Sequence, residues 1–111
     1  GLQTQEWMRA AGCRLATGDV VALTVDHCDP EARWCRSMYE VFKGPWAGAG
    51  GCLEFGSQPK TAINLAVHFY DYCNYGYFQR PIVRGRARHL SDANAAFTRD
   101  VMVKFKDVWE D

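Results

Sequence analysis

His68 and Asp71 are the residues of this 111-residue chain whose types and spacing best suit acid–base chemistry. An imidazole beside a carboxylate can take up and return a proton near neutral pH. Residues three apart share a face of a helix but point to opposite faces of a strand, so the element formed by 61–72 decides whether the pair can act. Glu54 is a third candidate for the same pocket. The competing interpretation is a histidine with a purely structural role.

A second group of residues suits binding rather than catalysis. Aromatic side chains are followed by arginines with no acidic residue between the first and last arginine, and the set is Tyr72, Tyr75, Tyr77, Phe78, Arg80, Arg84, Arg86 and Arg88. Aromatic and Arg side chains anchor protein interfaces, so we expect a protein partner or a second copy of the chain, with a small-molecule ligand as a further possibility. Plain solvated surface is the alternative.

Overall charge and known motifs exclude several functions. Thirteen basic and thirteen acidic residues cancel, which argues against nucleic acid as the partner of the Arg-rich stretch. The chain contains no G-x-x-x-x-G-K-S/T, no G-x-G-x-x-G and no H-E-x-x-H, so neither a cofactor nor a metal is expected. His68 and Asp71 interrupt the longest apolar run, and we expect no membrane span.

Five cysteines are many for a chain of this length: Cys13, Cys28, Cys35, Cys52 and Cys73. Two disulfides with one remaining thiol would fit an oxidising compartment, and this content favours a secreted or organelle-lumen protein without fixing the location. Buried thiols are the second interpretation. A metal site is the weakest of the three, because no C-x-x-C pair is present.

The central stretch over 61–72 fits either a strand or a helix. Ile63, Leu65, Val67 and Phe69 alternate as in a strand, and IVRGRARHL alternates after them, which predicts a hairpin around residues 74–76. Helical periodicity instead gives a polar stripe of Lys60, Asn64, His68 and Asp71, with Pro59 and Gly76 as boundary residues. Composition favours the strand.

The flanking segments give clearer indications. Thr4 is a plausible cap for a helix over 3–16, and Asp29-Pro30 predicts a helix over 30–43. Strands are predicted over 19–27 and 51–56. For 91–109, a cap at Ser91 and the length of the segment favour a helix over a strand.

Two resemblances to known families bear on the fold. The run AAGCRLATGDVVALTVDHCDPEARW resembles, over about a quarter of the chain, the opening of SnoaL-like proteins of the NTF2-like fold. That likeness implies a cone-shaped ligand pocket, although the terminal strands of that fold would be cramped before Asp111. The glycine-rich loop with Tyr70-Asp71-Tyr72-Cys73 is similar to secreted phospholipases A2, but Tyr70 stands where that family requires His. Neither likeness assigns the chain to a family.

The sequence therefore predicts one α+β domain over 1–111. Its antiparallel sheet would have about four strands, 19–27, 51–56, 61–72 and 77–89, packed with two or three helices; a mostly α fold is the alternative. We expect a non-catalytic binding protein, with a subunit of a larger assembly as one form of this function. Its contact surface would run from Tyr72 to Arg88. A small enzyme or ligand-pocket protein using His68 and Asp71 is the second hypothesis.

Overall fold

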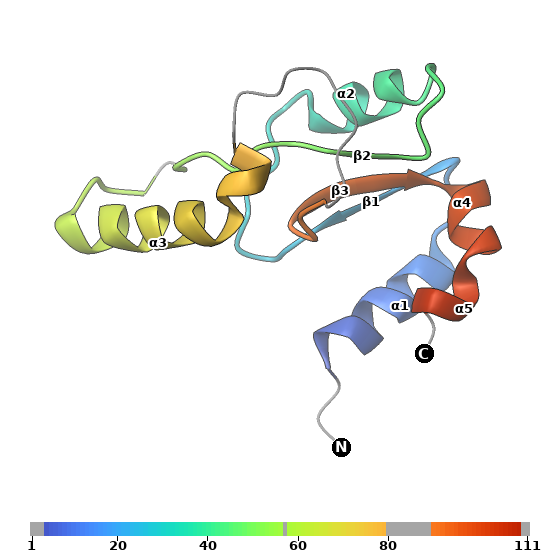
Figure 1. Ribbon diagram of the computed structural model, residues 1–111, viewed down its shortest axis with the longest axis horizontal. Helices are drawn as coiled ribbons and strands as arrows, with labels where there is room; N and C mark the ends of the chain where they lie inside the picture. Colours follow the sequence, from blue (N-terminus) through green and yellow to red (C-terminus); the bar gives the residue numbers. More distant parts are fainter. Residues whose placement is uncertain (1–3, 57, 80–89, 110–111) are drawn as a thin grey trace.

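The computed structural model describes residues 4–56, 58–79 and 90–109, and for residues 71–79 it describes the backbone alone. The described elements are α1 (Gln5–Leu15), β1 (Val20–Thr24), α2 (Trp34–Val41), β2 (Gly48–Gly50), α3 (Ala62–Gln79), β3 (Asn94–Thr98), α4 (Arg99–Lys104) and α5 (Lys106–Trp109). Helices and an antiparallel sheet thus form one small α+β domain, which confirms the predicted fold class. In Figure 1, α2 lies on one side of the sheet, and α1, α4 and α5 lie on the other.

The sheet has three described strands in the order β1-β3-β2, and both pairings are antiparallel. Central β3 pairs Ala96 with Ala22 on one side and with Ala49 on the other. The small residues of β2 are needed for this pairing. A Cβ at Gly48 would lie 2.9 Å from the Phe97 ring, and one at Gly50 would lie 2.9 Å from the Asn94 carbonyl oxygen. Strand β2 can therefore approach β3 only because it is built from glycine and alanine.

Little of the described chain is buried. The buried apolar side chains are small or flexible: Ala10, Val21, Met38, Ala93, Ala95, Ala96 and Met102. No large side chain among the described residues has less than 2% of its surface exposed. Small domains bury a low fraction of their surface and are marginally stable for that reason. Many of the large apolar side chains among the described residues are instead exposed.

Asn94, the first residue of β3, connects three parts of the fold. Its Oδ1 accepts a hydrogen bond from Trp34 Nε1 at 2.8 Å, and its Nδ2 donates to the Cys52 carbonyl oxygen at 3.1 Å. The Asn94 backbone also accepts from Gly51 N at 3.3 Å. One amide side chain thereby holds the start of α2 and the segment after β2 against the central strand.

Several sequence predictions are confirmed at the N-terminal end. Thr4 caps α1, because its Oγ1 accepts from Trp7 N at 3.3 Å. Strand β1 lies within the predicted strand 19–27. The helix predicted over 30–43 exists but is shorter: α2 begins at Trp34, and its cap position is Arg33 rather than Asp29, with no side-chain cap hydrogen bond. Glu31 and Trp34 instead form a turn through a 2.8 Å backbone bond.

Other predictions are wrong. Residues 61–72 form the first part of a helix rather than a strand, and the hairpin around 74–76 is absent because the backbone is helical through Gln79. The strand predicted at 51–56 is replaced by β2 three residues earlier. Of the strand predicted over 77–89, residues 77–79 are helical and the remainder lies outside the described residues. The sheet therefore shows three strands where about four were expected.

The C-terminal segment combines the two alternatives. Residues 94–98 form β3, and helical structure begins only after it, in α4 and α5. The predicted cap at Ser91 does not begin a helix, since the Ser91 hydroxyl accepts from Ala93 N at 3.3 Å in a turn. Thr98 takes that role for α4, because its Oγ1 accepts from Val101 N.

Candidate functional site

Helix α3 begins at a set of local hydrogen bonds around Thr61. The Thr61 hydroxyl accepts from Asn64 N at 3.2 Å, which is the geometry of an N-cap. The Asn64 side chain donates to the Pro59 carbonyl oxygen at 2.8 Å, and Leu65 N bonds to Thr61 O at 2.9 Å. These bonds fix the start of the helix and turn Asn64 back toward the preceding segment.

Two residues of the polar stripe on α3, Asn64 and His68, face their own chain. Asn64 and His68, one turn apart, are half-buried, whereas the residues around them are exposed. The His68 ring packs edge-on against Phe55, with the ring centroids 5.3 Å apart and the planes at 84°. The histidine thus supports the contact between α3 and the segment that leads to it.

The opposite side of α3 is apolar and faces outward. This apolar arc consists of Ala62, Ile63, Leu65, Ala66, Val67, Phe69 and Tyr70, all of them exposed. The exposed fractions are 76% for Ile63, 66% for Phe69 and 68% for Tyr70. At 3.6 residues per turn the arc covers roughly 200° of the helix circumference. A helix on the surface of a globular protein ordinarily turns its apolar stripe inward, so the orientation of α3 is reversed.

Figure 1 shows the setting of this arc: α3 projects away from the sheet, at the end of the molecule opposite α4 and α5. Other large apolar side chains are also exposed, including Leu15 on α1 and Val108 on α5. On α1, Arg9, Ala10 and Cys13 turn inward, while the large apolar residues Trp7, Met8 and Leu15 are exposed as well. Over residues 62–70 of α3, the exposed apolar residues form one continuous side, opposite the half-buried Asn64 and His68.

The predicted binding residues fall on this helix or beyond it. Tyr72, Tyr75, Tyr77 and Phe78 belong to the second half of α3, whose backbone is helical. The four arginines, Arg80, Arg84, Arg86 and Arg88, lie outside the described residues. The apolar arc therefore adjoins the predicted surface along the same helix. The arc was not among the predicted binding residues, although the helical alternative for 61–72 already identified the polar stripe on the opposite side.

The predicted catalytic residues lie on a helix, which is the element that their pairing requires. His68 and Asp71 stand three residues apart on α3, so their backbone positions share one side of the helix. Glu54 is exposed and directly precedes Phe55, the ring partner of His68. Neither of two surface hollows near the sheet is lined by His68 or Glu54. The described geometry gives His68 a packing role against Phe55.

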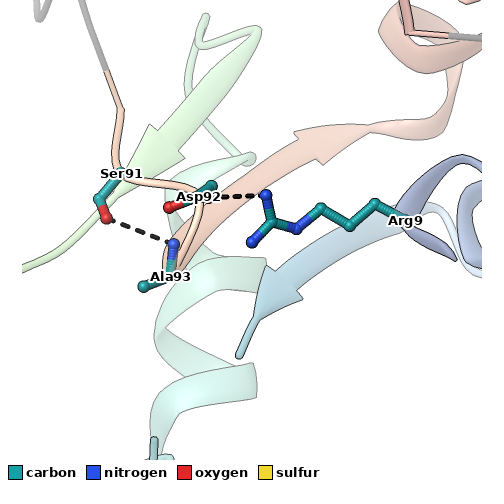
Figure 2. Close-up of polar contacts among 4 residues, drawn as sticks. All are labelled: Arg9, Ser91, Asp92 and Ala93. Carbon is teal, nitrogen blue, oxygen red and sulfur yellow. Dashed lines mark hydrogen bonds and ion pairs between the residues drawn. The ribbon is translucent and has the colours of Figure 1, made fainter. Parts of the chain in front are cut away.

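An ion pair joins α1 to the turn before β3. Figure 2 shows Arg9 reaching toward Asp92, with Nη1 2.6 Å from the Asp92 carboxylate. The Arg9 side chain is 22% exposed, and its buried Nη2 has no hydrogen-bond partner among the residues that the structure describes. Ser91, which precedes Asp92 in the same turn, is buried, and its hydroxyl accepts a hydrogen bond from Ala93 N. This contact positions α1 against the sheet at the cost of one unsatisfied donor.

The cysteines and possible metal ligands show no assembled site. No disulfide joins any two of Cys13, Cys28, Cys35 and Cys52, and pairings with Cys73 fall outside the described side chains. Burial raises the pKa of the Cys13 thiol. Within the residues that the structure describes, no three His, Cys, Asp or Glu side chains could hold one metal ion, and no helix is long and apolar enough to cross a membrane.

Comparison with known proteins yields no relative: no family model, curated protein or solved structure matches this chain. The geometry of α3 is therefore the basis of the proposed function.

Proposed function

We propose that this chain is a non-catalytic binding protein, a subunit that associates with another protein through the apolar arc of α3. The observation that carries the proposal is the reversed orientation of this helix. His68 of the polar stripe packs on Phe55, while Ile63, Phe69 and Tyr70 on the apolar side are each about two-thirds exposed or more. A protein partner would remove these side chains from water.

The size of the arc suits an interface. Burying a Leu, Ile, Val or Phe side chain contributes about 1.5–3 kcal/mol, and the large side chains of the arc are only partly exposed, so together they would contribute on the order of 5 kcal/mol. Association itself costs an estimated ~4–15 kcal/mol. The arc alone thus supports weak binding. A tight complex would need additional contacts, and the aromatic and Arg residues from Tyr72 to Arg88 are the proposed source.

The thin core supports the same conclusion. Among the described side chains, the buried apolar set contains four alanines and no aromatic residue, while Leu65, Val67 and Phe69 remain outside it. Exposed apolar surface of this extent on a small protein is typical of an interaction site. The contact would be one of helix in groove, in which apolar residues at spacings of three and four enter a partner's cleft.

Size measurement in the native host tests the proposal. The tagged chain, expressed at native level, should elute from the extract well above its mass of 12.6 kDa. Replacing Ile63 and Phe69 by Gln should move it to the position of the monomer. Matched changes of exposed residues on α2, Arg36→Gln and Tyr39→Gln, should leave the elution unchanged. Elution of the unaltered chain as a monomer would contradict the proposal.

A further inference from the structure

We propose that the free edge of β1 binds an extended peptide segment of another protein, which adds a strand to the sheet in the groove between β1 and α1. This site is separate from the apolar arc of α3 and goes beyond the proposed function. In the described sheet, with the order β1-β3-β2, strand β1 pairs on one side only. Such an edge presents unpaired backbone donors and acceptors, which are the groups that strand addition uses.

The ladder between β1 and β3 shows which backbone groups of β1 are free. Arg99 N donates to the Asp19 carbonyl oxygen at 2.8 Å, and the register places residue 99 opposite residue 19. Hydrogen-bonded pairs alternate along an antiparallel ladder, so Val21 and Leu23 are the residues of β1 that bond to β3. The N–H and C=O groups that point toward the free edge belong to the other three residues of the strand, Val20, Ala22 and Thr24.

Strand β1 lacks the features that usually protect a sheet edge. Its five residues, VVALT, include no charged residue and no proline, and its register with β3 runs through five consecutive pairs without a bulge. Charged residues, proline and bulges ordinarily keep exposed edges from pairing with other chains. Ala22 and Thr24 are exposed. The edge is therefore open to an added strand.

Helix α1 forms the other wall of the groove along this edge. The groove has a volume of about 360 Å³, and its described lining consists of β1 together with Arg9, Gly12, Cys13 and Ala16. Arg9 is the charged residue of this lining, and it is already paired with Asp92. The groove therefore suits an uncharged segment with small or β-branched side chains. Because α1 walls the groove, a single extended segment enters it more readily than the edge of a second folded sheet.

Gly12 keeps the groove open on the side of α1. It lies inside a helix, where glycine is unfavourable, and it is exposed. A Cβ built at Gly12 would meet no atom of another described part of the chain within 4 Å, so internal packing does not require glycine at this position. Close approach of a partner's backbone is a use of glycine that fits this place.

Amide hydrogen exchange of the purified full chain, followed by NMR, tests the free edge. The probe is a peptide selected from a library of random linear heptapeptides on the variant Ile63→Gln with Phe69→Gln, whose apolar arc lacks two of its large side chains. In the unaltered chain without peptide, the amides of residues 20, 22 and 24 should exchange at least about tenfold faster than those of residues 21 and 23. The peptide should slow the exchange of the first three about tenfold or more. Failure to select a peptide, or slowing confined to other elements, would overturn the proposal.

Two variants block the groove in different ways. Ala22→Pro removes an N–H of the free edge without taking a bond from β3, and Gly12→Leu fills the groove while favouring the helix. Each should keep its circular dichroism and weaken peptide binding about tenfold or more. The controls should bind like the unaltered chain: Ala22→Ser keeps the N–H, and Gly56→Leu adds the same side chain at another glycine with open space around it.

The variants and a dilution series provide the remaining outcomes. Equal peptide affinity of Ala22→Pro, Gly12→Leu and the controls would show that the peptide binds elsewhere and would overturn the proposal. Protection of the edge amides that rises with protein concentration in the absence of peptide would assign the edge to a second copy of the chain, and it would overturn the assignment to another protein.

Discussion

Replacing Asn94 by Ala removes the amide that connects three parts of the fold. Two hydrogen bonds are lost: the one from Trp34 Nε1 at 2.8 Å and the one to the Cys52 carbonyl oxygen at 3.1 Å. The backbone bonds of residue 94 do not depend on its side chain and should persist. The expected effect is a loss of stability and not a loss of fold.

The magnitude follows from the two lost bonds. Each hydrogen bond contributes about 0.5–1.5 kcal/mol net to stability, so Asn94→Ala should lower the free energy of unfolding by about 1–3 kcal/mol. Trp34 is half-buried, so water can reach its indole N–H after the change, and the full cost of a dry unsatisfied donor does not apply. For a domain near 100 residues, this loss lowers the Tm by roughly 5–15 °C.

Thermal and urea unfolding of four variants measure this effect. Asn64→Ala is the matched control: it deletes the same amide at a solvent-exposed hydrogen bond to Pro59, and it should change the unfolding free energy by less than about 0.5 kcal/mol. Trp34→Phe, alone and combined with Asn94→Ala, completes a double-mutant cycle, with an expected coupling of about 0.5–1.5 kcal/mol. If Asn94→Ala costs no more than Asn64→Ala, or if the cycle shows no coupling, the assigned role of Asn94 is wrong.

Three further predictions concern other parts of the fold. Gly50→Ala should destabilise the protein by about 1–3 kcal/mol in urea unfolding, because the new Cβ would lie 2.9 Å from the rigid Asn94 carbonyl oxygen; an unchanged midpoint would argue against this strand pairing. Asp92→Ala should destabilise the protein more than Arg9→Met. Asp92→Ala leaves a mostly buried guanidinium without its carboxylate, whereas Arg9→Met removes the guanidinium together with its unsatisfied Nη2. Equal losses of unfolding free energy in the two variants would contradict this asymmetry. The raised pKa of Cys13 keeps its thiol protonated to higher pH, so iodoacetamide should modify Cys13 in the folded protein more slowly than the exposed Cys35. The modification rate of Cys13 should rise at a higher pH in the folded protein than in the unfolded chain. Equal modification rates of Cys13 and Cys35 at neutral pH would refute the burial of Cys13.

The parts of the fold that the sequence predicted correctly have local causes. A cap at Thr4 begins α1 regardless of the remainder of the chain, and the alternation after Asp19 marks β1. The α+β class followed from the presence of both kinds of signal. Local signals of this type act within a few residues and can be read from the sequence without knowing the tertiary contacts.

The errors arise where tertiary contacts decide. β-Branched and aromatic residues in 61–72 suggested a strand, but strand preference largely reflects packing against neighbouring strands. Here the Thr61 hydroxyl accepts a hydrogen bond from Asn64 N and a helix begins instead. The true strands include Gly48–Gly50 and Asn94–Thr98. Their glycines and alanines have low strand propensity. Strands β2 and β3 can pair because small residues are the ones that fit between them. No local sequence pattern reveals this requirement.

The candidate site was predicted in part. Helical periodicity showed the polar stripe around Asn64 and His68, and the aromatic residues that follow on the same helix were selected as a binding surface. The reversed orientation of α3 could not be predicted, because the contact of His68 with Phe55 joins residues thirteen positions apart. Amphipathicity defines the two sides of a helix but does not tell which one faces the protein in an irregular fold.

Photo-crosslinking from position 69 tests the central claim most directly. A photoreactive phenylalanine analogue replaces Phe69, which is 66% exposed in the centre of α3, and the same analogue at the exposed Arg36 on α2 serves as the control. The apolar arc predicts that illumination in the native host joins residue 69 to another polypeptide chain, with a much lower yield from residue 36. Products confined to the same chain, or equal yields from the two positions, would contradict the assignment of α3 as the binding surface.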